Sequence, residues 1–204
     1  MSIQLKRKLL RQQVLEEEKQ KRKLQPPIVL TSNPATEMLG TNEAQAYYRY
    51  LGKYRGYKVH ALLYVWPWDI TPWDRKIDYE PLILLEKKGK IVAALSRIHY
   101  TWFLYKIDQP LFAFYPNGHT PIPLSLKEGD SVIALDEEAV PFENFLRVAF
   151  LKIAMIEERE LRRGRRRGIN IVYRPLKKSL MREADFGDEV LREYLDKAVQ
   201  KLES

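Results

Sequence analysis

Residues 82–107 read LILLEKKGKIVAALSRIHYTWFLYKI, and this stretch decides the expected fold. Two apolar runs, residues 82–86 and 91–105, flank the tetrapeptide Lys87-Lys88-Gly89-Lys90, in which glycine supplies the positive φ that a tight turn requires. The pattern therefore predicts a β-hairpin. The returning run is too long for one flat strand, so we expect it to bend or bulge midway.

Further strands are predicted on both sides of this hairpin. Residues 58–65 alternate between two partly apolar faces, which indicates a strand inside a sheet. Residues 111–115 and 120–124 flank Asn117-Gly118, the strongest two-residue hairpin signal in the chain. Short strands are also expected at residues 131–135 and at residues 169–173, which could rejoin the sheet edge. The six segments up to residue 135 predict a curved, mainly antiparallel sheet or partial β-barrel of about six strands.

Four longer segments are predicted to be helical. Residues 141–163 carry a broad apolar stripe that could cover the open face of the sheet. The other three are residues 2–24, which end before Pro26-Pro27, the tyrosine-rich residues 41–54, and a last helix that begins at Asp185 or Asp188. We therefore expect an α+β fold, with a basic helical arm over residues 1–25 and a single α+β domain over residues 26–204.

The composition is that of a globular protein, with 45% hydrophobic, 11% aromatic and 30% charged residues. The absence of cysteine excludes a disulfide framework, a thiolate nucleophile and any cysteine-ligated metal site. The sequence shows neither a signal peptide nor an apolar run near the roughly 18 residues that span a bilayer. We therefore expect a cytoplasmic protein without membrane insertion. Abundant Lys, Arg and Glu with little Asn fit a protein from a hot environment.

Common catalytic motifs are absent from the sequence. It contains no GxxxxGK[ST], GxGxxG or GxSxG pattern, and His60, His99 and His119 lack the spacing of a metal site. We therefore expect a non-enzymatic protein with no catalytic residues, no metal and no cofactor.

An arginine run carries the main functional signal. The net charge of +8 concentrates in residues 1–25 and 147–178, and residues 162–168 read RRGRRRG. Arg162 and Arg163 can complement a helix C-terminus, but this role does not explain the three arginines that follow Gly164. Because guanidinium groups bind phosphate in a bidentate manner, we expect DNA or RNA as partner, contacted mainly through its phosphates. The residues expected to make these contacts are Arg162, Arg163, Arg165, Arg166, Arg167, Arg174, Lys177 and Lys178.

Tryptophans and carboxylates leave other interpretations open. Trp66, Trp68 and Trp73 could stack on bases or sugars, or could instead close one end of a barrel. Asp78 with Glu86 and Lys88 loosely matches a metal-dependent nuclease motif. A further alternative is an assembly or virion-type structural protein, a homo-oligomer or larger assembly in which the helical arm makes subunit contacts.

Overall fold

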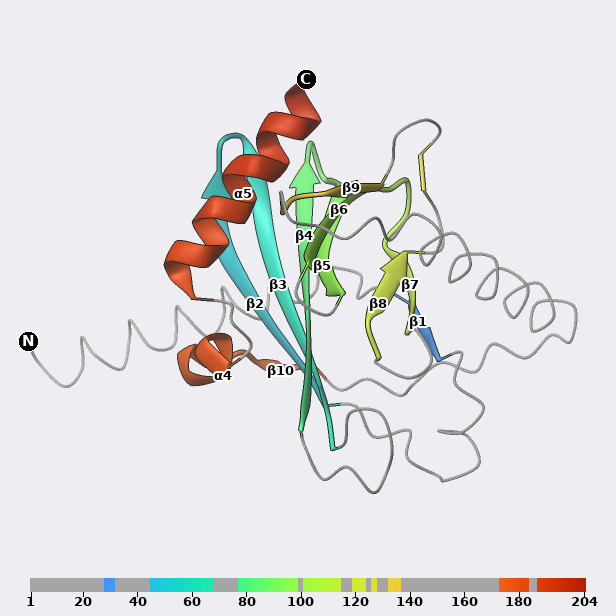
Figure 1. The fold of residues 1–204 in the computed structure, drawn as a ribbon, viewed down its shortest axis with the longest axis vertical. Helices are drawn as coiled ribbons and strands as arrows, with labels where there is room; N and C mark the ends of the chain where they lie inside the picture. The colour runs from blue at the N-terminus through green and yellow to red at the C-terminus, as the bar shows by residue number, and fades with distance from the viewer. Residues whose placement is uncertain are drawn as a thin grey trace, which may run out of the picture.

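The computed structural model describes residues 28–31, 45–67, 77–98, 101–114, 119–123, 126–127, 132–136, 173–183 and 187–204. Strands account for 60% of these residues. A mixed seven-stranded sheet forms the main body, with the strand order β10-β2-β3-β4-β5-β6-β9 (Figure 1). Its strands are β2 (Gln45–Tyr54), β3 (Tyr57–Trp66), β4 (Asp78–Lys87), β5 (Lys90–Ile98), β6 (Thr101–Lys106), β9 (Val132–Ala134) and β10 (Tyr173–Pro175).

A second, three-stranded sheet has the order β1-β7-β8. Its strands are β1 (Ile28–Thr31), β7 (Leu111–Phe114) and β8 (Pro121–Pro123). The pairing of β7 with β8 confirms the hairpin expected around Asn117-Gly118, although the turn itself lies outside the described residues. β1 joins β7 in parallel, and β10 joins β2 in parallel, while the remaining strand pairs are antiparallel.

The central hairpin forms as expected from residues 82–107. Lys88 and Gly89 take positive φ values of 53° and 80° in the turn between β4 and β5. The long returning run is not one bent strand, because β5 and β6 pair with each other antiparallel and Ile98 faces Thr101. This pairing lets both halves of the apolar run lie inside the same sheet.

The tyrosine-rich segment is a strand, so the helix predicted over residues 41–54 is wrong where the structure describes it. β2 pairs with β3 along its length, with a register shift between Tyr50 and Gly52. Gly52 has a φ of 107°, which glycine adopts without the steric penalty of a Cβ. The bulge changes the phase of the strand, so Tyr47, Leu51 and Tyr54 pack against the same core cluster. Their spacing imitates a helical period.

The two faces of the large sheet bury different clusters. One face, the helix face, packs Val59, Ala61 and Leu63 with residues of α5 (Asp188–Glu203), which crosses β2 and β3 in Figure 1. On the opposite face, Tyr64 and Trp66 contact Phe114 of β7 edge to face. We call this second face the β7 face.

The α+β fold class expected from the sequence is therefore wrong, because the described part of the chain is mostly β. Its two helices are α4 (Lys178–Glu183) and α5, and both contribute side chains to the cluster on the helix face. The strands form two sheets rather than one sheet of about six strands. The helices predicted over residues 141–163 and 2–24 lie outside the described residues. The division at residue 25 stays a prediction.

Candidate ligand-binding site

Few of the residues expected to bind nucleic acid fall in the described part of the chain. The exposed residues among them are Arg174 in β10, Lys177 just before α4 and Lys178 at the start of α4. Trp66 is only 1% exposed, and its ring stacks on the His119 imidazole with 4.2 Å between centroids. This tryptophan thus takes the packing role that the sequence left open as the alternative. The other residues expected to bind or stack on nucleic acid lie outside the described residues: Arg162, Arg163, Arg165, Arg166, Arg167, Trp68 and Trp73.

Three neighbouring strands instead bring together a polar cluster that no local sequence pattern predicts. Lys58 and His60 lie two residues apart on β3 and therefore project from the same face of the sheet. Tyr50 lies opposite His60 on β2, and Glu86 lies opposite Lys58 on β4. With Tyr48, which precedes Tyr50 on the same face of β2, these residues form what we call the His60 site.

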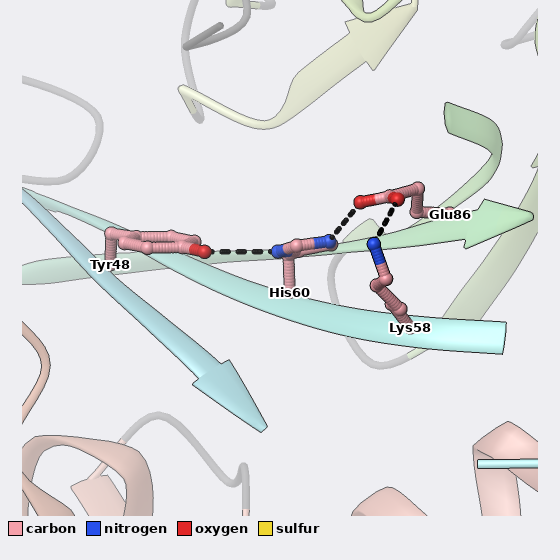
Figure 2. Close-up of polar contacts among 4 residues, drawn as sticks. All are labelled: Tyr48, Lys58, His60 and Glu86. Carbon is pink, nitrogen blue, oxygen red and sulfur yellow. Dashed lines mark hydrogen bonds and ion pairs between the residues drawn. The ribbon is translucent and has the colours of Figure 1, made fainter. Parts of the chain in front are cut away.

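Hydrogen bonds join the His60 site into one chain (Figure 2). The Tyr48 hydroxyl lies 3.0 Å from Nδ1 of His60, and Nε2 of His60 lies 3.0 Å from Oε2 of Glu86. The Lys58 ammonium donates to Oε1 of Glu86 at 2.6 Å. Aromatic rings enclose the imidazole, because Tyr50 and Tyr48 lie 5.3 and 6.1 Å from it between centroids.

Exposure differs across the site. The side chain of His60 is 6% exposed, that of Glu86 is 13% exposed and that of Lys58 is 43% exposed. The two tyrosines are half-buried. A ligand in solvent can therefore reach the Lys58 end and the tyrosine rings, while His60 is held behind them.

Burial and charge set the protonation of these groups. Desolvation lowers the pKa of His60 and outweighs the opposing effect of Glu86, so the ring is neutral at pH 7. Burial, followed by the Glu86 charge, raises the pKa of Tyr48 to about 12. Burial alone would raise the pKa of Glu86, but hydrogen bonds from Lys58 and His60 bring it below its ordinary value. The site thus holds a carboxylate, a neutral imidazole and a protonated phenol.

A histidine between a hydroxyl and a carboxylate resembles the arrangement that activates nucleophiles in triads. Activation would require Tyr48 to lose its proton, and the raised pKa of this hydroxyl opposes that loss. The arrangement therefore suits hydrogen bonding to a ligand better than covalent catalysis.

The carboxylates of the supposed nuclease motif are too far apart to share a metal ion. Asp78 and Glu86 lie eight residues apart on β4, about 26 Å at the rise of a strand. Asp78 instead lies 2.9 Å from Nδ1 of His119, at the opposite end of the strand from the His60 site. Among the described residues, no group of three or more His, Asp or Glu side chains is arranged to hold a metal.

The sequence offered only partial signals for the His60 site. Glu86 belongs to the nuclease-like pattern, and Tyr48 and Tyr50 fall in a segment that the sequence predicts to be helical. The alternation of Lys58 with His60 was visible, but their partners on β2 and β4 depend on strand register. Register between strands is a tertiary property that one strand's sequence does not specify.

Comparison with known proteins found no matching family model and no matching curated protein. Among solved structures, the chain is similar to Necrosis and Ethylene inducing Protein 2 from the causal agent of cocoa's witches' broom disease, at 18% identity and a TM-score of 0.38. That match covers 52% of this chain and 66% of the other. NLPPya in complex with glucosamine matches at 14% identity and a TM-score of 0.42, over 85% of this chain and 86% of the other. A structure described as a toxin fold for microbial attack and plant defense matches at 13% identity and a TM-score of 0.41, over the same shares.

The functions expected from the sequence do not agree with the descriptions of these structures. The matched structures are described as a necrosis-inducing protein and a toxin fold, not as a nucleic-acid-binding protein, a virion or assembly protein, or a nuclease. The separation of Asp78 from Glu86 independently removes the nuclease site, and the burial of Trp66 removes one of the three proposed stacking rings.

Proposed function

We propose that this protein binds carbohydrate at the His60 site. The observation that carries the proposal is the placement of two half-buried tyrosine rings beside a fixed and partly exposed lysine–glutamate pair. Sugars present both apolar C–H faces and hydroxyl groups, and this site offers a complement to each.

The aromatic part of the site suits the apolar face of a sugar ring. Tyr48 and Tyr50 project from the same face of β2, and both pack against His60. Half-buried tyrosines offer a large apolar surface at a small entropic cost, because packing already restricts their rotamers.

The charged part suits sugar hydroxyls. Lys58 uses one of its three donor positions on Glu86, and each Glu86 oxygen accepts one bond while retaining further lone-pair capacity. Hydrogen bonds to charged groups are shorter and stronger than neutral ones, and the ion pair holds both groups in place before a ligand arrives.

Glycan binding would be tested with the full chain on an array of immobilised glycans, followed by calorimetric titration of the glycans that bind. Tyr50→Ala removes a ring but leaves both hydrogen bonds of His60 intact, so we expect binding to weaken about tenfold, or about 1.4 kcal/mol. Lys58→Ala should weaken binding by a similar factor because it removes a donor and releases Oε1 of Glu86, while His60 still holds Oε2.

Lys90→Ala is the matched control, because Lys90 is an exposed lysine on β5 and its loss changes the net charge equally. This variant should bind glycans like the wild type. The proposal fails if the wild type binds no glycan on the array, or if Tyr50→Ala and Lys58→Ala bind as tightly as Lys90→Ala.

The cellular location is separate from this proposal. No helix in the described ranges is long and apolar enough to cross a membrane. The cytoplasmic location expected from the sequence remains a prediction, which fractionation of the source cells would test.

A further inference from the structure

The hydrogen bonds of His60 determine which way the Tyr48 proton points. A carboxylate can only accept hydrogen bonds, so Nε2 of His60 carries the proton that Glu86 accepts at 3.0 Å. In a neutral imidazole the other nitrogen, Nδ1, is then a bare acceptor. Tyr48, 3.0 Å away, must donate its own proton to Nδ1.

This direction leaves Tyr48 with lone pairs for any third group. A phenol has one proton to donate, and His60 takes it. Toward a ligand, the Tyr48 oxygen can therefore only accept. Glu86 also only accepts, so Lys58 is the donor among the hydrogen-bonded groups of Figure 2.

We infer that His60 is a specificity-determining residue, which makes the Tyr48 oxygen an acceptor that selects ligand groups able to donate a proton. This inference rests on the proposed carbohydrate function. Protonating His60 would reverse the selection, because Nδ1–H would then donate to Tyr48 and release the phenolic proton toward the ligand. With His60 neutral, the site would thus prefer a ligand with a free hydroxyl. With His60 protonated, it would accept an alkylated oxygen.

Burial favours the first state at neutral pH and outweighs the titratable groups that face His60. Among the described residues these are Tyr48 and Tyr50 from β2, Lys58 on the same strand and Glu86 from β4. Glu86 favours the protonated ring, whereas the Lys58 charge and burial oppose it. Lys58 opposes part of the carboxylate's influence on the pKa of His60, since its ammonium lies 2.6 Å from one Glu86 oxygen.

The proton positions can be measured without any ligand. Nitrogen-15 NMR of the full chain, with His60→Gln used to assign the signals, distinguishes a ring protonated on Nε2 from one protonated on Nδ1. We expect the Nε2–H tautomer at pH 7.5 and a doubly protonated ring after acidification. An Nδ1–H tautomer at pH 7.5 would overturn the inference, whether or not glycans bind.

The selectivity is tested by titrating methyl glucoside and its mono-O-methyl ethers at pH 7.5. A methyl ether keeps the oxygen acceptor but removes the donor, so at least one ether should bind about tenfold more weakly than the parent sugar. Tyr48→Phe should abolish that difference, and Tyr47→Phe, which alters the opposite face of β2, should preserve it. Equal binding of all ethers to the wild type would contradict the inference. Failure of every sugar to bind would instead reject the carbohydrate function, and the tautomer measurement would still decide the orientation of Tyr48.

Discussion

His60 is a single residue whose charge state is decided by its neighbours. Its side chain is 6% exposed between two tyrosines, and burial keeps the ring neutral although a carboxylate accepts its Nε2 proton. In the unfolded chain the same histidine titrates near its ordinary pKa of 6.5. Folding therefore lowers the proton affinity of this ring, which links stability to pH.

The direction of that pH dependence follows from proton binding. Below about pH 6.5 the unfolded chain binds a proton at residue 60 more readily than the folded chain, so the free energy of unfolding decreases as the pH falls toward the folded pKa. Glu86 acts in the same direction at lower pH, because its folded pKa lies below the ordinary 4.5 and its contribution is lost as the pH falls through that folded value. We expect urea unfolding to show lower stability at pH 5.5 than at pH 7.5.

The matched variant for this prediction is His60→Gln, which keeps hydrogen-bonding groups but cannot titrate. Its stability should decrease less than that of the wild type between pH 7.5 and pH 5.5. Identical pH dependence in the two proteins would show that His60 contributes nothing to it. The comparison uses the change with pH, so a lower absolute stability of the variant does not affect the result.

At the scale of the elements, one carboxylate joins a strand to a helix. Asp136, just beyond β9, accepts the backbone N–H of Trp102 at 2.7 Å and the Tyr194 hydroxyl at 2.6 Å. Because Trp102 belongs to β6 and Tyr194 to α5, this carboxylate connects the helix to the sheet. The rings of Trp102 and Tyr194 also pack together, 5.2 Å apart between centroids.

Tyr194→Phe tests this connection because it removes the hydroxyl and retains the ring. We expect a loss of about 1–2 kcal/mol in the free energy of unfolding, since a partly buried carboxylate loses a hydrogen bond. Tyr47→Phe is the control, because the Tyr47 hydroxyl donates to Gln45 at an exposed position, and its effect should stay within about 0.5 kcal/mol. Equal losses in chemical denaturation would argue against the role of Asp136.

At the scale of the whole molecule, an apolar cluster lies on each face of the large sheet. The helix face is covered by α5, which contributes the buried side chains Leu191, Leu195, Ala198 and Val199, and by Met181 of α4. The β7 face is covered in part by β7, through Phe112 and Phe114. A sheet that is apolar on both faces requires cover on both.

Leu195→Ala tests whether α5 is an integral layer. Leu195 is 4% exposed within the helix-face cluster, so truncation should reduce the free energy of unfolding by about 2–5 kcal/mol. Val190→Ala, on the same helix at 40% exposure, should cost far less. Similar urea midpoints for the two variants would mean that packing of α5 on the sheet adds little to the free energy of unfolding.

The sequence by itself determined the local strand and turn chemistry. Alternation at residues 58–65, the glycine at position 89 and the apolar stripe after Asp188 predicted β3, the β4–β5 turn and α5, and all three are confirmed. These features depend on side-chain period and on backbone φ, which neighbouring residues control. The helix predicted from the tyrosines of β2 is wrong, because the bulge at Gly52 gives these strand residues the spacing of a helix.

Only the tertiary structure decided the site. Tyr48, His60 and Glu86 lie on three strands, and up to 38 residues of chain separate them, so no local pattern marks them as partners. Strand register places them in one row, and burial by the surrounding rings then fixes their protonation. Register is set by cooperative pairing across the whole sheet, which is why the fold, and not the sequence alone, creates the His60 site.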